Sequence, residues 1–151
     1  MNSLLDQQMA DDIIGRLQQL TPDHKAEWGK MSAHQMLSHC ADVLRDILGD
    51  RQTPVLVSPE VAERARQIIL APEPFPHDLR AIKLYRQEDG GTQPTNFQDD
   101  RTTLISLVKR LQSTAENFSF GPHPAIGFLS RDEHGFHTWK HLDHHLRQFG
   151  V

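Results

Sequence analysis

Near the end of the sequence, the stretch KHLDHH (residues 140–145) holds three histidines within five positions. An α-helix advances about 100° per residue, so side chains four residues apart differ by only about 40° around its axis. His141 and His145 therefore share one side of a helix, whereas His144 points elsewhere. Two imidazoles at this spacing can bind one cation, because their Cβ atoms are about 5–6 Å apart and zinc–nitrogen bonds are about 2.0–2.1 Å. A tight metal site also needs a third ligand from another part of the chain.

The stretch SAHQMLSHCADV (residues 32–43) offers two candidates for that third ligand, His34 and His39. Each lies about 110° from the centre of the apolar stripe of its predicted helix, on opposite flanks, so periodicity does not choose between them. Cys40 lies near the middle of that stripe and is predicted to be a buried small hydrophobe rather than a ligand. These residues alone also fit a solvated helix face, or a metal-free interaction module with a titratable histidine-rich surface.

The helices that must position these histidines follow from the spacing of apolar residues. Four long amphipathic helices are predicted at residues 3–20, 32–48, 100–117 and 130–150. Ser32 and Ser130 each precede a glutamine or glutamate by three residues, the spacing of a capping box at a helix start. Gly49 and Gly150 are predicted to end two of the helices. Together these signals favour an all-α fold, a four-helix bundle.

The connection between the second and third long helices is predicted to be a long crossover. It contains a short helix at about residues 58–70 and then an irregular stretch from 72 to 98, with one extended piece, AIKLY, at residues 81–85. Irregular segments of this length are uncommon in compact domains unless they are functional. The stretch is therefore expected to form a lid or pocket wall, or else a plain packed excursion.

Composition limits the classes of function. The 151 residues fit a single domain, 1–151, with one core. A net charge of −4 argues against a nucleic-acid partner. No apolar run approaches the roughly 18–20 residues of a membrane span, so no membrane partner is expected. A single cysteine and the lack of a basic, apolar leader favour a cytoplasmic location.

Two blocks of the sequence, residues 28–43 and 123–151, resemble the DinB/YfiT-like superfamily, most closely a branch of unknown function. Members of that superfamily are four-helix bundles that hold a divalent metal through three histidines. One comes from the second helix in a pattern like MLSHC, and two come from the last helix in a pattern like KHLDHH. The resemblance thus implies His39, His141 and His145 as metal ligands, and it favours His39 over His34.

The sequence departs from the pattern of the superfamily at two positions on the approach to the last helix. Aromatic residues are expected where this sequence has Ile126 and His134. Because neither is a predicted ligand, the departures concern the shape of the pocket rather than the metal site.

The resemblance also implies a function. Three neutral imidazoles leave a coordination position open, as in catalytic zinc sites. A metal bound in this way can lower the pKa of water to about 7 or hold a thiol as thiolate. The expected protein is therefore a metal-dependent enzyme on a small-molecule substrate. The reaction is either the transfer of a low-molecular-weight thiol such as bacillithiol, mycothiol or glutathione, or hydrolysis.

Several features of this function stay open. Zinc or nickel is expected, with iron or manganese as alternatives, and relatives suggest a homodimer. No general base is assigned, because spacing places neither Asp42 nor Asp143 well; Asp143 is expected to be a surface charge. Gln148 could reach the pocket. The alternative is a non-catalytic bundle in which the ion stabilises the fold or an interface.

Overall fold

Every regular element of the chain is helical. The computed structural model describes residues 1–151 and contains no β-strand, which confirms the all-α prediction. The α-helices are α1 (Gln7–Gln19), α2 (Ala33–Ile47), α3 (Pro59–Ile69), α4 (Phe97–Gln112) and α5 (Arg131–Gln148), and a 3-10 helix, η1, spans Lys83–Tyr85. None of these helices is both long and apolar enough to cross a membrane.

Polar side chains define where the helices begin. The predicted capping boxes at Ser32 and Ser130 are both present, each with reciprocal side-chain bonds to the third residue of its helix. The predicted start of α4 at residue 100 was three residues too late, because Asn96 caps the helix by accepting a hydrogen bond from the Asp99 N–H. Its predicted end was also too late, since α4 stops at Gln112.

The extended piece predicted at residues 81–85 is wrong. The chain there folds into the η1 turn, in which the Tyr85 N–H donates to the Ile82 carbonyl at 3.0 Å. The Gly90 N–H donates to the Lys83 carbonyl at 3.0 Å. Because local turns satisfy these backbone groups, no neighbouring strand is needed.

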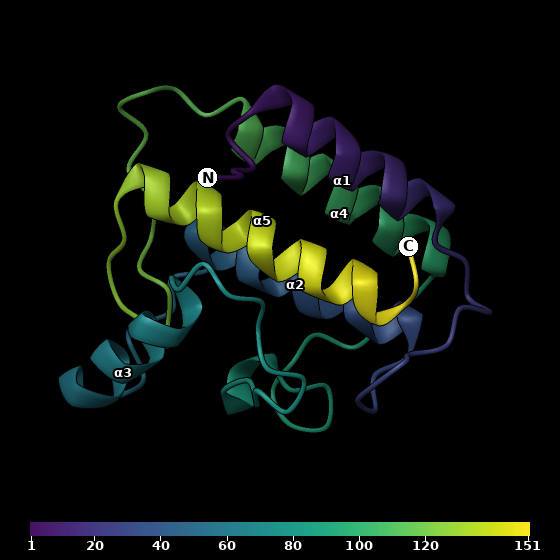
Figure 1. Ribbon diagram of the computed structural model, residues 1–151, viewed down its shortest axis with the longest axis horizontal. Coiled ribbons are helices and arrows are strands. Elements are labelled where there is room, and N and C mark those ends of the chain that lie inside the picture. Colours follow the sequence, from purple (N-terminus) through teal and green to yellow (C-terminus); the bar gives the residue numbers. More distant parts are fainter.

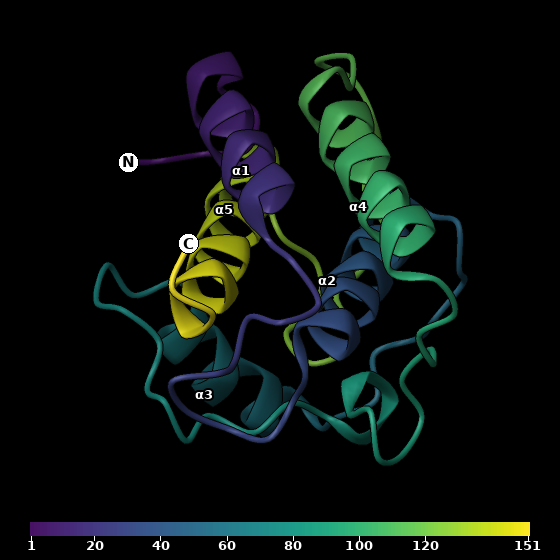
Figure 2. The same cartoon turned by 90° about the vertical axis from the view of Figure 1, so that its right-hand side faces the viewer.

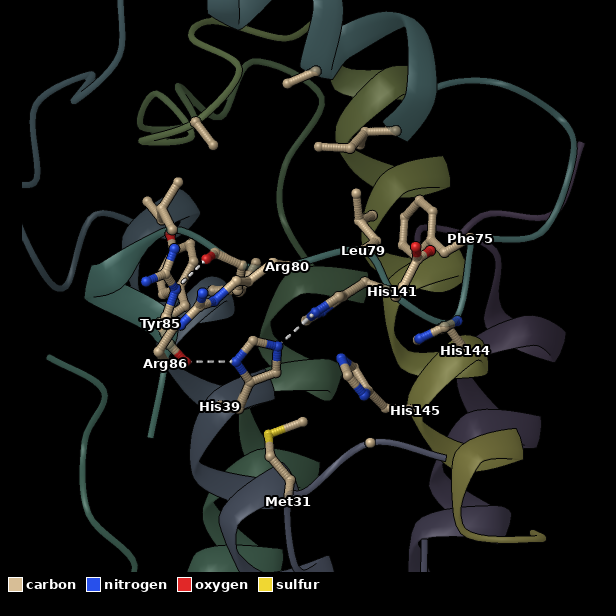
Figure 3. A pocket seen from close by; sticks show the side chains of 18 of the residues that line it. Met31, His39, Phe75, Leu79, Arg80, Tyr85, Arg86, His141, His144 and His145 are labelled. Carbon is tan, nitrogen blue, oxygen red and sulfur yellow. Dashed lines mark hydrogen bonds between the residues drawn. The ribbon is translucent and has the colours of Figure 1, made fainter. Parts of the chain in front are cut away.

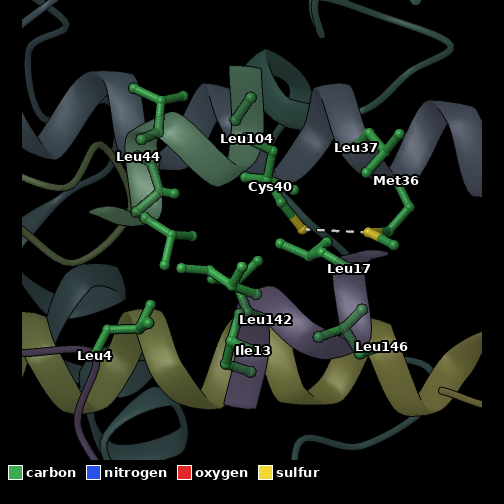
Figure 4. Close-up of a cluster of buried hydrophobic side chains, with 14 of the residues drawn as sticks. Leu4, Ile13, Leu17, Met36, Leu37, Cys40, Leu44, Leu104, Leu142 and Leu146 are labelled. Atoms are coloured by element: carbon green, nitrogen blue, oxygen red, sulfur yellow. Dashed lines mark hydrogen bonds between the residues drawn. The ribbon is translucent and has the colours of Figure 1, made fainter. Parts of the chain in front are cut away.

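Four helices pack around one hydrophobic core. α2 contacts α4 and α5, and α1 contacts the same two helices (Figures 1 and 2). The core cluster has 22 buried residues, among them Leu17, Leu44 and Leu142, from three of the helices (Figure 4). Burying each such leucine contributes about 1.5–3 kcal/mol. Cys40 is 1% exposed within this cluster, as predicted for a small hydrophobe.

The outer side of α2 and α5 is covered by loops and by α3. None of the residues of α3 is buried, and it lies outside the four packed helices (Figure 2). Its C-terminal end is tied to α5 by the Lys140 ammonium, which donates to the carbonyls of Ile68, Ile69 and Ala71. As a result α2 and α5 have the core on one side and a covered space on the other, and the histidines lie in that space.

Candidate metal centre

Three histidines meet where α2 and α5 face this space. His39 comes from α2, and His141 and His145 come from successive turns of α5 (Figure 3). One ring nitrogen from each lies within 4.8 Å of the others. His39 and His145 are 5% and 8% exposed, and His141 is half-buried. The structure thus brings together the three side chains singled out in the sequence, a group that could hold a metal ion.

Hydrogen bonds fix the tautomers of two of the rings. His39 Nδ1 donates to the Tyr85 carbonyl at 2.9 Å, so the Nε2 of the neutral ring carries a free lone pair. His145 Nδ1 donates to Gln148 Oε1 at 2.8 Å, while the Gln148 amide donates to the Trp28 carbonyl at 2.7 Å. Both imidazoles therefore have a bare Nε2, held in place by a partner on the opposite nitrogen, as is usual for histidine ligands of metals.

The third ring, His141, can complete the set of three nitrogen ligands after a change of tautomer. His141 Nε2 lies 3.0 Å from His39 Nε2. Since the His39 nitrogen is bare, His141 Nε2 donates in the metal-free protein, and as a metal ligand the neutral ring would carry its proton on Nδ1 instead. Nitrogens on a tetrahedral zinc are about 3.3 Å apart, as follows from zinc–nitrogen bonds of about 2.0–2.1 Å. Small side-chain rotations would bring all three to that spacing, so the residues fit a metal ion.

The electrostatic surroundings keep the three rings neutral. Burial lowers the pKa of His39, His141 and His145 below the ordinary histidine value. Positive charge on His145 would further disfavour protonation of His141, and charge on His39 does the same to His145. Neutral imidazole is the form that binds a metal. Near neutral pH the three rings are therefore already in the metal-binding form, and a metal ion does not have to compete with protons for them.

The competing histidine and the acidic candidates are held elsewhere. His34 contacts Asp100 at 2.6 Å, toward α4, which settles the choice that helical periodicity left open. The Asp42 carboxylate accepts from the N–H and hydroxyl of Thr92. Neither His34 nor Asp42 belongs to the histidine group.

Asp143 is not the surface charge that was predicted. It is 9% exposed and pairs with Arg16 of α1 at 2.9 Å and with Arg147 at 2.6 Å. The arginine from α1 reaches across to it because the two helices are neighbours, a contact that the sequence of α5 does not reveal. Gln148, in contrast, does reach the pocket and bonds directly to His145.

The three histidines line a cavity of about 1120 Å³. The irregular stretch between α3 and α4 forms part of its wall through Phe75, Leu79 and Tyr85 (Figure 3), as expected for a pocket wall. α3 contributes Val61 and Ile68. The site is therefore open to a space large enough for a small molecule.

Two further histidines of α5 border the same cavity, one of which, His144, was predicted from helical spacing to point elsewhere. His144 packs edge-on against Trp28 and Phe75, with ring centroids 5.5 Å apart in each case, and His137 also lines the cavity. The prediction assumed that only one face of the helix meets the pocket. In the structure, loops wrap around more than one face, and no local sequence signal gives their path.

The fold and the site define an all-helical protein with a largely buried group of three histidines that could hold a metal ion. The chain belongs to the family described as "Protein of unknown function (DUF1569)", which matches residues 2–150. No curated protein and no solved structure matches the chain significantly. Because the family description names no activity, a functional argument has to start from the geometry of the site.

Proposed function

We propose that this protein is a divalent-metal-dependent enzyme that transfers a thiol to, or hydrolyses, a small molecule. The observation that supports the proposal is that the three-histidine group borders a cavity of about 1120 Å³. Structural zinc sites are closed by four protein ligands, whereas catalytic sites use three and leave a position open. Here three nitrogens converge and the remaining direction has room for a ligand.

His39, His141 and His145 would hold the ion through their Nε2 atoms. Imidazole suits zinc and nickel, and iron or manganese stay as alternatives. A bound ion would lower the pKa of a coordinated water or keep a thiol as thiolate. The Tyr85 carbonyl and Gln148 keep two of the rings oriented, and apolar residues such as Ile68 and Phe75 line the cavity beside them.

The resemblance to the DinB/YfiT-like superfamily supports the same proposal. Its four-helix bundle, with one ligand on the second long helix and two on the last, agrees with the packing of α1, α2, α4 and α5 and with the origin of the three histidines. We therefore include a low-molecular-weight thiol among the candidate substrates.

A non-catalytic metal site is the second candidate. The observations that favour it are that the ligands come from two helices, so that an ion would tie α2 to α5, and that Asp42 and Asp143 are engaged elsewhere. An ion that binds only the folded chain stabilises it by mass action. The two candidates share a metal and differ in turnover.

The first experiment measures metal content. Untagged protein, dialysed against zinc and separately against nickel, is analysed for metal per chain alongside the His39→Ala and His145→Ala variants. Near one ion per chain is expected in the wild type, with loss in both variants. His34→Ala is the matched control, because His34 lies on the same helix but contacts Asp100. Absence of metal from wild-type protein that retains its helical circular dichroism would rule out both candidates.

The second experiment separates the candidates. Metal-loaded wild type and the His145→Ala variant are screened for thiol consumption with electrophilic substrates and for hydrolysis of esters and amides. Turnover in the wild type alone supports the enzyme. A loaded protein with a higher melting temperature but no turnover across the screen supports the non-catalytic candidate.

A further inference from the structure

A second histidine pair continues the wall of the cavity beyond the candidate metal centre. His137 lies one turn before His141 on α5, with nearly parallel rings whose centroids are 6.0 Å apart. His123 comes from the loop before α5 and meets His137 at right angles, with centroids 4.9 Å apart. The two side chains are 5% (His123) and 3% (His137) exposed, and both line the cavity.

The tautomer of His123 is fixed by the backbone. Its Nδ1 accepts a hydrogen bond from the Ala125 N–H at 3.1 Å. Burial lowers the pKa of His123 to about 4, so the ring is neutral at pH 7 and its one proton is on Nε2. No protein acceptor takes this Nε2–H. The nearby Asp46 carboxylate is already engaged by the Tyr85 hydroxyl at 2.6 Å and by Arg51 at 2.8 Å.

His137 has no hydrogen-bond partner within the protein. Its Nδ1 is fully buried and unpaired, and burial lowers the pKa of the ring well below the usual value, so it is also neutral. The ring borders the cavity, and since Nδ1 is enclosed, Nε2 is the nitrogen that a ligand can reach. No protein group occupies this Nε2 either, so it is free to form a polar contact with a ligand.

The remaining wall indicates what kind of ligand would suit this pair. The cationic side chains that line the cavity (Lys30, Arg64, Arg80 and Arg86) outnumber the acidic ones (Asp78 and Glu88). Glu88 already faces Arg80 at 3.7 Å. Apolar side chains make up much of the rest, including Val57, Val61, Ile68 and Ala125. This lining suits a molecule with an apolar body and an oxygen that accepts hydrogen bonds.

We propose that His123 and His137 bind a carboxylate or carbonyl oxygen of a small molecule with an apolar body, and so hold the substrate beside the three-histidine centre. The assignment of this molecule as substrate rests on the proposed function, whereas the binding itself needs no metal. His123 donates its Nε2–H to the ligand oxygen, and His137 supplies the second polar contact. Both are binding residues that contact the ligand directly.

The test uses phenylacetate and 2-phenylacetamide as probes, with 2-phenylethylamine as a probe that shares the body and lacks the oxygen. Binding to zinc-free and to zinc-loaded protein is followed by nitrogen-15 NMR of the histidine rings. In the free protein His123 is expected as the Nε2–H tautomer. Both oxygen-bearing probes should shift its Nε2–H signal, and the amine should not. Whichever of the two binds more tightly identifies the ligand oxygen as carboxylate or carbonyl.

Variants then assign the contact. His123→Phe should weaken phenylacetate binding by about tenfold or more, the usual loss for one hydrogen bond to a charged group. His123→Gln, which keeps an N–H donor, should recover part of the loss and guards against a folding defect. His134→Phe is the matched control, because His134 is a buried histidine of α5 that does not line the cavity. The affinity of this variant for phenylacetate should differ less than twofold from that of the wild type.

The outcomes distinguish this inference from the proposed function. If zinc does not bind but phenylacetate still binds zinc-free protein in a His123-dependent way, the oxygen site stands and the metalloenzyme fails. If zinc binds while no probe shifts the His123 signal, or while His123→Phe binds phenylacetate as tightly as wild type, the inference is overturned and the metal site is untouched.

Discussion

At the scale of single residues, Gln148 links the loop before α2 to the candidate metal centre. Its amide oxygen accepts from His145, and its amide nitrogen donates to the Trp28 carbonyl. The loop can approach this closely because Gly29 adopts a φ of 78°, and a Cβ there would lie 2.7 Å from Gln148 Nε2. One uncharged side chain thus sets the tautomer of a histidine and anchors a wall of the cavity.

The first prediction concerns this contact. Gln148→Leu is expected to weaken zinc binding by about 10–100-fold, the usual cost of removing a partner that orients a metal-binding histidine. Competition with a chromophoric chelator would measure the affinity. Gln19→Leu, the same substitution at an exposed position of α1, should leave it unchanged. Equal affinities in the two variants would mean that His145 is not oriented through Gln148.

The second prediction concerns His134, which occupies a position where the family resemblance leads us to expect an aromatic residue. Its ring packs on Phe120 with centroids 4.7 Å apart, and its Nδ1 is buried without a partner. His134→Phe should keep the packing, remove the unpaired nitrogen and raise the free energy of unfolding by about 1 kcal/mol. Urea denaturation at pH 7 measures this change; a loss of stability would show that the nitrogen has a partner.

At the scale of helices, α3 differs from the others because polar contacts rather than burial hold it. It has no buried residue. Lys140 of α5 binds the carbonyls at its C-terminal end, and Arg66 of α3 pairs with Glu133 of α5. A helix with so little apolar burial is expected to open locally at low free energy.

The third prediction follows for α3. Lys140→Met should increase amide hydrogen exchange in α3 at least severalfold, because it removes three hydrogen bonds at the helix end while keeping an apolar stem. Exchange in α2 should stay the same. Lys109→Met, at an exposed position of α4, is the control. Unchanged exchange in α3 would mean that the Arg66–Glu133 pair is sufficient to hold it.

At the scale of the whole molecule, buried neutral histidines couple stability to pH. Burial lowers the pKa of His123, His134 and His144 from 6.5 to about 4, and it lowers the pKa of the three candidate ligands as well. Below pH 6.5 the unfolded chain binds protons that the folded chain does not. The free energy of unfolding is therefore highest above about pH 7, and it decreases as the pH falls from 6.5 toward 4.

The fourth prediction gives this dependence a magnitude. The shift of the nearly fully buried His123 alone corresponds to about 3 kcal/mol lost by pH 4. Urea denaturation of metal-free protein at pH 7.5, 6.0 and 5.0 should show a steady loss, and His123→Phe should show a shallower one. A constant stability between pH 7.5 and 5.0 would mean that these histidines are not buried as the structure places them.

The sequence by itself determined the helices and two of the three candidate ligands. The capping boxes at Ser32 and Ser130 and the apolar periodicity depend on residues three or four positions apart, so they can be identified locally. The spacing of His141 and His145 is local in the same way. The resemblance to a family added His39, which helical geometry alone could not separate from His34.

Only the tertiary structure decided what these residues face. It placed His34 against Asp100, tied Asp143 to Arg16 of α1, and brought His123 and His137 into the wall of the cavity. Each of these contacts joins segments distant in sequence or depends on the path of an irregular loop, and side-chain periodicity carries no information about either. Periodicity defines the faces of a helix, whereas packing decides which neighbour covers each face.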